Sequence, residues 1–325
     1  MVNASDKKIQ HQKLRPSALS VDVTNICNLR CQHCFWSTHE SSKTATTNKN
    51  IINLVKDILN KYPSITNITW YGGEPLINEE TRKLVEEGIK LRKNNLVITN
   101  GYFPIPNWQK NAHFAVSIDG TEKVHDRLRC MPGLYKMLKK NIQDAVKQGI
   151  SVAALYCINA TNIDCIPDFM EEWKDKGLIG VVFTTYVPIK GKNSDICLTD
   201  EQRDKVVDIL IKMKKKYGSL IGNTELMIEL IRSKYSEDLA KKCPMNALNE
   251  NVKTYSLHMC NDGTIRVPCA FGAGASHLHC RSITKVALYA GKVLHDRDSL
   301  LALFRMYHSK PYSKEKKVTI NLTGL

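Results

Sequence analysis

Three cysteines lie close together near the start of the chain, at Cys27, Cys31 and Cys34 in the stretch CNLRCQHC. Thiolates are the usual ligands of iron–sulfur clusters, and a four-iron cluster that only transfers electrons normally takes four of them. Three thiolates would leave one iron open to another ligand, where chemistry can occur. A structural zinc site is the alternative, but zinc sites more often use separated pairs of cysteines. The spacing therefore favours a cluster with one open iron.

A second group of cysteines follows in the last third of the chain, at Cys243, Cys260, Cys269 and Cys280. Four thiolates are enough to complete an iron–sulfur cluster or a zinc site. The Asn-Asp-Gly signal at 261–263 predicts a turn before the alternating residues 264–267, and such a two-stranded element would bring Cys260 and Cys269 together. We expect one iron–sulfur centre here, with zinc or buried metal-free thiols as alternatives.

The elements that position these residues alternate between short β-rich segments and longer helical ones. Helices are predicted at about 47–62, 78–93 and 133–148, and another begins after Thr199, which forms a capping-box pattern with Gln202. Six strands alternating with helices predict an α/β fold with a parallel sheet and right-handed crossovers. The predicted strands are residues 18–24, 67–71, 96–99, 114–118, 151–158 and 180–187.

Polar motifs follow directly after four of the predicted strands. They are the cysteine loop, the Gly-Gly-Glu-Pro turn at 72–75, Asn100 with its following glycine, and the Ser-Ile-Asp-Gly stretch at 117–120. Ligands of parallel sheets bind at the carboxyl ends of the strands, so we expect these motifs to meet on one rim. The pattern by itself allows either a doubly wound sheet or an open barrel.

The cysteine spacing, together with WYGGEPL at residues 70–76, resembles the radical S-adenosylmethionine (radical SAM) enzymes. The resemblance implies an open (β/α)6 partial barrel with a [4Fe-4S] cluster on Cys27, Cys31 and Cys34. The open iron would bind the amino and carboxylate groups of S-adenosylmethionine (SAM). Reductive cleavage of SAM would then give a 5′-deoxyadenosyl radical that takes hydrogen from a substrate. The implied reductant is a flavodoxin or a ferredoxin.

The resemblance assigns the amino group of SAM to the turn at Gly72, Gly73 and Glu74. Glycine lets the backbone approach a ligand closely, and Glu74 adds an acceptor for an amine. An ordinary turn between a strand and a helix is the alternative interpretation. The two motifs together favour the SAM-binding interpretation.

Four further residues are assigned to SAM by the same resemblance. Ser117 and Arg129 would bind the SAM carboxylate, since a guanidinium pairs with a carboxylate through two hydrogen bonds. A buried structural salt bridge is the other interpretation of Arg129. His33 would lie near the adenine, with metal binding as the weaker alternative, and Asn100 would contact the ribose. Phe35 and Trp36 are expected to pack around the cluster.

The pattern around Cys260 and Cys269 resembles the C-terminal auxiliary-cluster domains called SPASM or, in their shorter form, twitch. No cysteine follows Cys280, so at most one auxiliary [4Fe-4S] cluster is implied. That cluster could ligate the substrate or accept an electron from it. We expect four parts along the chain: a polar leader at 1–16, a radical SAM barrel at 17–217, a twitch-like domain at 218–308 and a basic tail at 309–325.

The 325 residues carry a formal net charge of +15 and include eleven cysteines. Such a charge attracts polyanions, but the lysines are spread along the chain without a nucleic-acid-binding motif. The polar start and the lack of a long apolar run predict a cytoplasmic protein, where metal binding explains the cysteines better than disulfides do. Four single cysteines are expected to be small buried residues: Cys130, Cys157, Cys165 and Cys197.

The substrate is less well defined than the chemistry. The resemblance around residues 119–129 favours a peptide or protein side chain. A lipid, another small metabolite or tRNA is the alternative within the same chemistry. An iron–sulfur scaffold or partner protein without catalytic activity is an alternative of another class, which the intact motifs disfavour.

Overall fold

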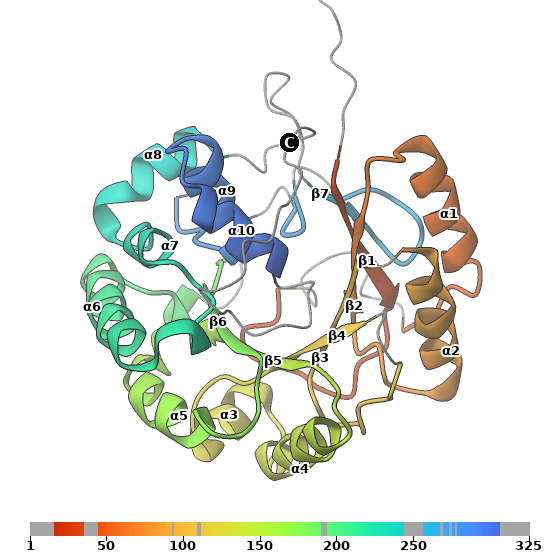
Figure 1. The fold of residues 1–325 in the computed structure, drawn as a ribbon, viewed down its shortest axis with the longest axis horizontal. Coiled ribbons are helices and arrows are strands. Elements are labelled where there is room, and N and C mark those ends of the chain that lie inside the picture. Colours follow the sequence, from red (N-terminus) through yellow and green to blue (C-terminus); the bar gives the residue numbers. More distant parts are fainter. Residues whose placement is uncertain are drawn as a thin grey trace, which may run out of the picture.

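A curved parallel sheet forms the centre of the molecule, surrounded by helices (Figure 1). The computed structural model describes residues 16–35, 45–92, 94–108, 112–189, 194–243, 256–266, 269–272, 275–276 and 278–305. Within these residues the sheet has seven strands in the order β6-β5-β4-β3-β2-β1-β7. Their bounds are β1 Ala18–Thr24, β2 Asn67–Gly72, β3 Asn94–Thr99, β4 His113–Ser117, β5 Val152–Ile158, β6 Gly180–Thr185 and β7 Ser256–Met259.

The six predicted strands are confirmed as β1 to β6, and each pairs in parallel with the next along the chain. Helices follow β1, β2, β4, β5 and β6 on the outer side, and the residues described between β3 and β4 contain no helix (Figure 1). This sequential order, rather than a reversal in strand order, distinguishes a partial barrel from a doubly wound sheet. The predicted α/β fold with an open (β/α)6 barrel is therefore confirmed.

The four helices that the sequence predicts are present as α1, α2, α4 and α6, and the other helices described below were not predicted. Asn78 accepts a hydrogen bond from the backbone of Thr81 at the start of α2, and Thr199 forms the predicted capping box with Gln202 at the start of α6. The helix bounds are α1 Ile51–Lys61, α2 Glu79–Gly88, α3 Glu122–Arg129, α4 Leu134–Lys147, α5 Ile166–Trp173, α6 Asp200–Tyr217, α7 Glu225–Glu229, α8 Ser236–Lys241, α9 Ile283–Lys292 and α10 Arg297–Arg305. Short 3-10 turns lie at Ile89–Leu91, Ile163–Cys165, Ser194–Ile196, Gly218–Leu220 and Ser233–Tyr235.

The seventh strand was not predicted. β7 pairs in parallel with β1, from Ala18 opposite Ser256 to Val21 opposite Met259. The predicted turn at 261–263 does form, since the Cys260 amide donates to the Thr264 carbonyl at 2.8 Å. Beyond the turn, residues 264–266 lie antiparallel to β7, with a bridge between Met259 and Ile265, while residue 267 lies outside the described residues. β1 would otherwise leave an edge of unpaired backbone groups, which β7 satisfies.

The core lies between the sheet and the surrounding helices. Trp70 on β2 is fully buried, and its indole Nε1 donates to Asn95 Oδ1 at 2.9 Å. Gly88 at the end of α2 lies directly against this ring, because a Cβ there would come within 2.2 Å of it. A second, smaller core joins α7, α9 and α10, with Leu230 and Leu288 fully buried. This second core fixes α9 beside the carboxyl end of β6.

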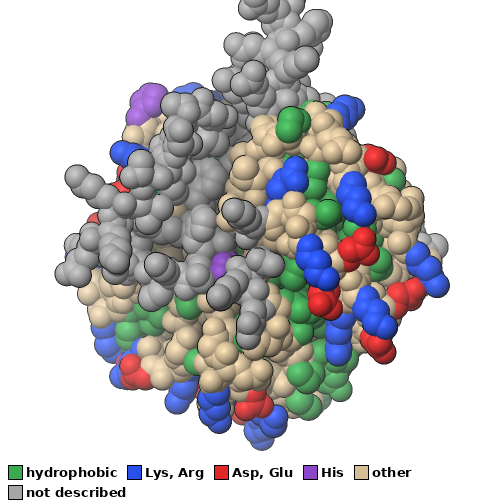
Figure 2. Space-filling view, turned by 45° about the vertical axis from the view of Figure 1, so that its right-hand side comes forward, with side chains coloured by type: hydrophobic (Ala, Val, Ile, Leu, Met, Phe, Trp, Pro, Cys, Tyr) green, Lys and Arg blue, Asp and Glu red, His purple; other side chains and the backbone are tan. Residues whose placement is uncertain are grey.

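The helices covering β1 and β2 present positive and negative side chains side by side (Figure 2). Lys83 pairs with Glu79 at 2.7 Å, Lys49 with Glu80 at 3.1 Å, and a third lysine lies opposite Glu87. Exposed pairs of this kind add little stability, but they prevent a continuous basic surface on this face. None of the helices described here has the length and apolar content needed to span a membrane.

Candidate functional site

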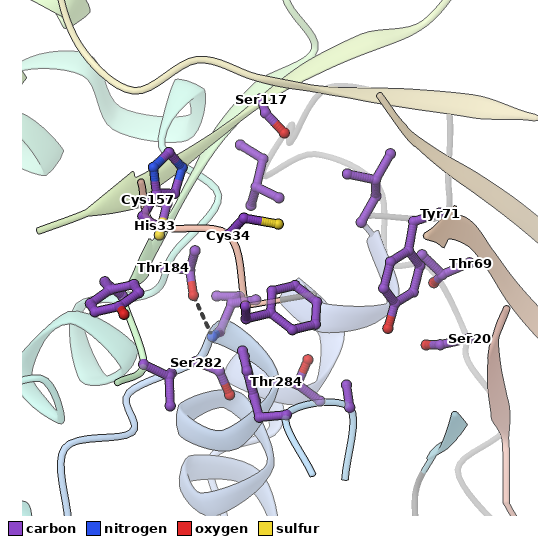
Figure 3. Close-up of a pocket in the computed structure, with 18 of the residues that line it drawn as sticks. Ser20, His33, Cys34, Thr69, Tyr71, Ser117, Cys157, Thr184, Ser282 and Thr284 are labelled. Atoms are coloured by element: carbon purple, nitrogen blue, oxygen red, sulfur yellow. Dashed lines mark hydrogen bonds between the residues drawn. The ribbon is translucent and has the colours of Figure 1, made fainter. Parts of the chain in front are cut away.

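A cavity of about 350 Å³ opens at the carboxyl ends of the strands, between the sheet and the start of α9 (Figure 3). It brings together the first cysteine group and three members of the second. Figure 3 shows Ser20, Thr69 and Tyr71, on β1 and β2, on one side of the cavity, and Thr184 on β6 with Ser282 on the other. The sequence-predicted site residues that line it are Cys27, Cys31, His33, Cys34, Gly72, Gly73, Glu74, Asn100, Ser117, Arg129, Cys243, Cys269 and Cys280. The prediction that separate motifs share one rim is thus confirmed.

The three cysteines of the first group lie on the loop that follows β1. The Cys34 amide donates to the Cys31 carbonyl at 3.2 Å, and the Leu29 amide donates to Cys27 Sγ at 3.4 Å. Burial raises the pKa of Cys27 to about 11 and that of Cys31 to about 12. Thiols of this kind ionise only when positive charge is brought to them, as a bound metal does. Three thiols on one loop facing one cavity therefore fit an iron–sulfur cluster.

The two glycines of the Gly-Gly-Glu turn give the cysteine loop room to pack. The Gly73 amide donates to the Thr24 carbonyl at 2.8 Å, and the next amide donates to the Ile26 carbonyl at 2.8 Å. A Cβ on Gly73 would lie 2.1 Å from the Ile26 carbonyl oxygen. Gly72 has a φ of +122°, which side-chain-bearing residues rarely adopt. The turn therefore fixes the start of the cysteine loop.

The carboxylate of Glu74 is fully buried and already has three donors. It accepts from Thr99 Oγ1 at 2.6 Å, from the Asn100 amide at 2.8 Å and from the Leu76 amide at 3.0 Å. Burial raises the pKa of Glu74, while these hydrogen bonds oppose that shift. The carboxylate thus ties the end of β2 to the end of β3, a positioning role that the sequence did not reveal.

Asn100 connects the same rim to the cysteine loop. Its Nδ2 donates to Asn28 Oδ1 at 2.9 Å, and its Oδ1 accepts from the Tyr102 amide at 2.9 Å. Asn28 stands between the first two cysteines of the loop. Asn100 therefore holds the cysteine loop and β3 in a fixed relation, besides lining the cavity.

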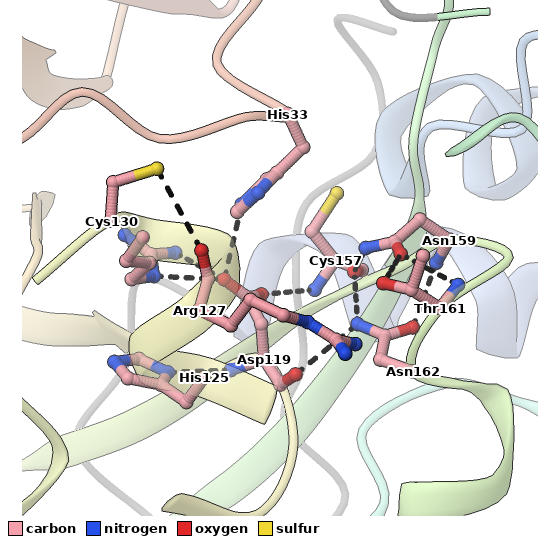
Figure 4. A network of polar contacts seen from close by, with 10 residues as sticks. His33, Asp119, His125, Arg127, Cys130, Cys157, Asn159, Thr161 and Asn162 are labelled. Atoms are coloured by element: carbon pink, nitrogen blue, oxygen red, sulfur yellow. Dashed lines mark hydrogen bonds and ion pairs between the residues drawn. The ribbon is translucent and has the colours of Figure 1, made fainter. Parts of the chain in front are cut away.

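Asp119 is the centre of a buried polar network (Figure 4). Its Oδ2 accepts from Arg129 Nε at 2.8 Å and Nη2 at 2.7 Å, and it lies 3.1 Å from His33 Nε2. Its Oδ1 accepts from the Cys157 amide at 3.0 Å. The buried salt bridge that was one interpretation of Arg129 is thus present, and the same guanidinium lines the cavity.

Electrostatics keep this network charged. Burial alone raises the pKa of Asp119, but Arg129 and then His33 lower it well below its usual range. Burial, and to a smaller extent the charge of Arg129, lowers the pKa of His125 to about 3, so this histidine is neutral. Its Nδ1 accepts a hydrogen bond from the Asp119 amide at 3.1 Å. His33 Nδ1 is buried and has no hydrogen-bond partner in the structure. That atom is available to a ligand in the cavity.

The four cysteines of the second group lie in two different surroundings. Cys243, Cys269 and Cys280 all line the cavity. Burial raises the pKa of Cys269 to about 11, and the nearby thiols of Cys280 and Cys243 raise it further. Cys260 lies instead beside Asp22, within 4.8 Å of its carboxylate. Cys260 is not among the residues that line the cavity, so the four cysteines do not all line it together. Cys260 directly follows β7 at the edge of the main sheet, beside Asp22.

Cys260 belongs to a buried network that the sequence did not reveal. Asp22 Oδ2 accepts from Arg266 Nη2 at 2.9 Å and lies 3.0 Å from His258 Nε2. His258 Nδ1 bonds to the Tyr71 hydroxyl at 2.5 Å. The one available signal was a carboxylate, the single charged residue of a largely buried strand. Because Arg266 already supplies positive charge, this network ties β1 to β7 without needing a cation.

Phe35 links the two cysteine groups through ring contacts. Its ring lies 5.0 Å from Phe271, edge to face, and 6.4 Å from Tyr71. This confirms that Phe35 packs beside the cysteine loop, while Trp36 lies outside the described residues. Phe271 follows Cys269 by two positions, so the aromatic contact holds the two cysteine-bearing segments against each other.

The four single cysteines are less buried than the sequence predicted. Cys130 is exposed and ends α3 with a φ of 54°, and Cys157, Cys165 and Cys197 are half-buried. Cys157 lines the cavity, because inward and outward positions alternate along β5. The expectation of buried apolar thiols is therefore wrong, since these residues lie at the ends of elements or on the cavity side.

Comparison with known proteins gives this arrangement a family. Residues 21–175 match the model of the radical SAM superfamily. The chain is 28% identical over 172 residues to the sporulation killing factor maturation protein SkfB of Bacillus subtilis, covering 50% of this chain and 40% of SkfB. It is 24% identical over 246 residues to a probable GTP 3′,8-cyclase of Methanocaldococcus jannaschii, covering 70% of this chain and 79% of the cyclase.

The fold is similar to that of Streptococcus suis SuiB bound to the precursor peptide SuiA, with a TM-score of 0.59 and 14% identity. That similarity covers 79% of this chain and 60% of SuiB. The chain thus spans less than two thirds of SkfB and of SuiB. The matched residues contain the cysteine loop, the Gly-Gly-Glu turn and the Asp119 network. Residues 21–175, which carry the three-cysteine loop at the rim of an open parallel barrel, match the radical SAM superfamily and give this chain a radical SAM domain.

Proposed function

We propose that this protein cleaves SAM reductively and uses the resulting radical to take a hydrogen atom from a peptide or protein side chain. Cys27, Cys31 and Cys34 would hold the [4Fe-4S] cluster. The cluster and SAM supply the electron and the 5′-deoxyadenosyl radical when they are bound. The observation that carries the proposal is the single cavity that joins the three thiols to the Gly-Gly-Glu turn and Arg129.

The chain's own residues would orient the cofactor. The salt bridge to Asp119 holds Arg129 at the cavity wall, where its remaining N–H groups can bind a carboxylate. The same carboxylate fixes the ring of His33, whose unpaired Nδ1 suits a nucleobase. Glu74 and Asn100 would act mainly by holding the turn and the cysteine loop in place. Ser117 lines the same wall and would add a hydroxyl to it.

Two observations support a peptide substrate. SkfB is named as a maturation protein for the sporulation killing factor, and SuiB binds a precursor peptide. The similarity covers 50% of this chain for SkfB and 79% for SuiB. A peptide side chain would enter the cavity from its open side and meet the radical near Ser117 and Cys157.

A small metabolite is the second candidate. The probable GTP 3′,8-cyclase matches a larger share of its own length than SkfB does. The cavity of about 350 Å³ is also small for SAM and a bulky substrate together. The mixed charges on the face shown in Figure 2 do not favour tRNA.

We further propose one auxiliary [4Fe-4S] cluster, held by Cys243, Cys269 and Cys280 in a twitch-like segment within 218–308. All three thiols share the cavity with the first group, whereas Cys260 is engaged with the Asp22 network. Three thiolates would leave one iron facing the cavity, where a substrate could bind it. A flavodoxin or ferredoxin in the cytoplasm would be the reductant.

Anaerobic reconstitution tests both centres. The chain should bind about eight irons, two four-iron clusters, and release 5′-deoxyadenosine when given SAM and dithionite. Cys31→Ala should abolish that release, whereas Cys269→Ala should retain some cleavage uncoupled from substrate. If neither the parent chain nor Cys269→Ala releases 5′-deoxyadenosine, the protein is a scaffold and the enzymatic proposal is refuted.

The substrate classes are separated by mass spectrometry. A peptide encoded beside the gene, incubated with the reconstituted chain and SAM, should lose two mass units if a side chain is oxidised or crosslinked, which is about the mass of two hydrogens. Conversion of GTP under the same conditions, with the peptide unchanged, would favour the small-metabolite alternative. Cys31→Ala is the control in both arms.

A further inference from the structure

Arg203, in the first turns of α6, is a buried cation without hydrogen-bond partners. Its side chain is 1% exposed, and Nε, Nη1 and Nη2 all lack a partner in the structure. Asp200 Oδ1 lies 3.8 Å from Nε, on a side chain that is 70% exposed. A guanidinium carries five N–H donors and stays charged, so burying it unpaired is costly.

The position of Arg203 adds to this cost. The amino end of a helix carries a partial positive charge, which disfavours a cation in the first turns. Burial accordingly lowers the pKa of Arg203. Three nearby groups raise it: the Cys197 thiol, the Asp200 carboxylate and the Cys280 thiol. The residue therefore lies close to the second cysteine group, where negative charge would offset its burial.

A second buried arginine lies beside it. Arg281 is fully buried, and its Nη1 donates to the carbonyls of Leu278 and Cys280 at 3.0 Å and 2.9 Å. Its Nη2 donates to Ser236 Oγ at 2.6 Å, while Nε has no partner. Burial, followed by the charge of Arg203, lowers the pKa of Arg281 to about 10. Two guanidinium groups thus repel each other next to Cys280.

Lys285 completes the group from α9. Its side chain is 1% exposed and lines the cavity. Burial lowers its pKa, and the thiols of Cys280, Cys243 and Cys269 counteract that shift. Cations from α6, α9 and the loop before α9 therefore all lie near Cys280, and Lys285 also lies near Cys243 and Cys269. Within the described residues, only the exposed Asp200 is a carboxylate acting on both arginines.

We propose that Arg203 and Arg281 form a buried cationic wall behind Cys280, which balances the negative charge of an iron–sulfur cluster on Cys243, Cys269 and Cys280 and makes that cluster easier to reduce. The inference rests on the proposed auxiliary cluster. Each added electron makes a thiolate-bound cluster more negative, so fixed positive charge nearby favours the reduced form. The same wall destabilises the metal-free chain, because its charge is then uncompensated.

The test isolates the second centre in the full-length chain. Cys27, Cys31 and Cys34 are all replaced with alanine, so that any remaining cluster belongs to the second group. This parent is reconstituted without SAM or substrate and titrated with dithionite while the cluster is followed by electron paramagnetic resonance. The test variant adds Arg203→Met, and the matched control adds Lys205→Met. Lys205 lies on the same helix but is 54% exposed and pairs with a surface aspartate.

Arg203→Met should lower the equilibrium constant for reduction by about tenfold or more, which is about 59 mV for one electron. Lys205→Met should change it by less than about twofold, because solvent screens its charge. In the metal-free chain, Arg203→Met should raise the melting temperature by about 2–4 °C, since a buried uncompensated charge is removed. A purely structural role for Arg203 would instead lower that temperature and leave the potential unchanged.

The outcomes separate the inference from the proposal beneath it. A parent chain that binds no iron would refute the auxiliary cluster and, with it, this inference. A loaded parent whose potential is the same in Arg203→Met would overturn the inference alone. A further outcome is that Arg203→Met stays folded but loses its iron. If Arg203→Lys then keeps its iron, iron binding itself shows that the cluster needs a positive charge at this position. Equal iron loss in both variants would show that charge at this position is not what holds the cluster.

Discussion

Replacing Asp119 with asparagine should destabilise the protein strongly while changing its shape little. The carboxylate is fully buried and bonds to Arg129 at 2.7 Å and 2.8 Å, with His33 at 3.1 Å. Asparagine is nearly isosteric, but it carries no charge and leaves the guanidinium buried without its counterion. Removing one partner of a buried ion pair costs about 3–5 kcal/mol.

That cost sets the size of the expected shift. For a chain of 325 residues, each kilocalorie lowers the melting temperature by roughly 1–2 °C, so Asp119→Asn should lower it by about 3–10 °C. Asp164→Asn is the matched control, because Asp164 is 81% exposed and pairs with Lys205 at the surface. The control should melt close to wild type, since exposed pairs contribute little.

The pH dependence has a definite sign. The folded pKa of Asp119 lies well below its unfolded value, so its contribution is complete above the unfolded pKa of about 3.9 and is lost as the pH falls towards the folded pKa. The gap between wild type and Asp119→Asn in urea melts should therefore stay constant from neutral pH to about pH 5 and narrow only below about pH 4.

A compensating substitution provides the decisive check. Asp119→Asn combined with Arg129→Met removes the stranded charge, and it should recover part of the lost stability. The reasoning is wrong if Asp119→Asn melts with the wild type, or if the gap between them already closes at pH 6. It is also wrong if the double variant is less stable than Asp119→Asn alone. All measurements use the metal-free chain under anaerobic conditions.

Two further substitutions test how the rim is held. Gly73→Ala should cost about 1–3 kcal/mol by overpacking and lower iron binding, because its Cβ would lie 2.1 Å from the Ile26 carbonyl oxygen. Gly180→Ala is its control, with only an ordinary contact at 3.6 Å, and iron binding equal in the two variants would contradict the packing argument. Glu74→Gln should cost about 1–3 kcal/mol in urea melts, since its amide would face a donor such as the Thr99 hydroxyl. An unchanged midpoint would show that this hydrogen bond contributes nothing.

Residues near one another in the chain determined much of this protein. The pattern of apolar residues predicted the six strands β1 to β6, because residues close together in the chain show which side chains a strand buries. Thr199 and Gln202 predicted a helix start, since a cap needs only residues three apart. The cysteine loop and the Gly-Gly-Glu turn predicted one rim, because parallel strands place their carboxyl ends together.

Only the tertiary structure decided which distant groups meet. The pairing of β7 with β1, and with it the place of Cys260 beside Asp22, depends on how residues 256–259 return to the sheet edge. The contacts of Asp119 with His33 and Arg129 likewise join three segments. No local pattern encodes such encounters, because their energy arises from burial and charge between segments far apart in the chain. The unpaired guanidinium of Arg203 is visible only in that context, since burial alone makes it unusual.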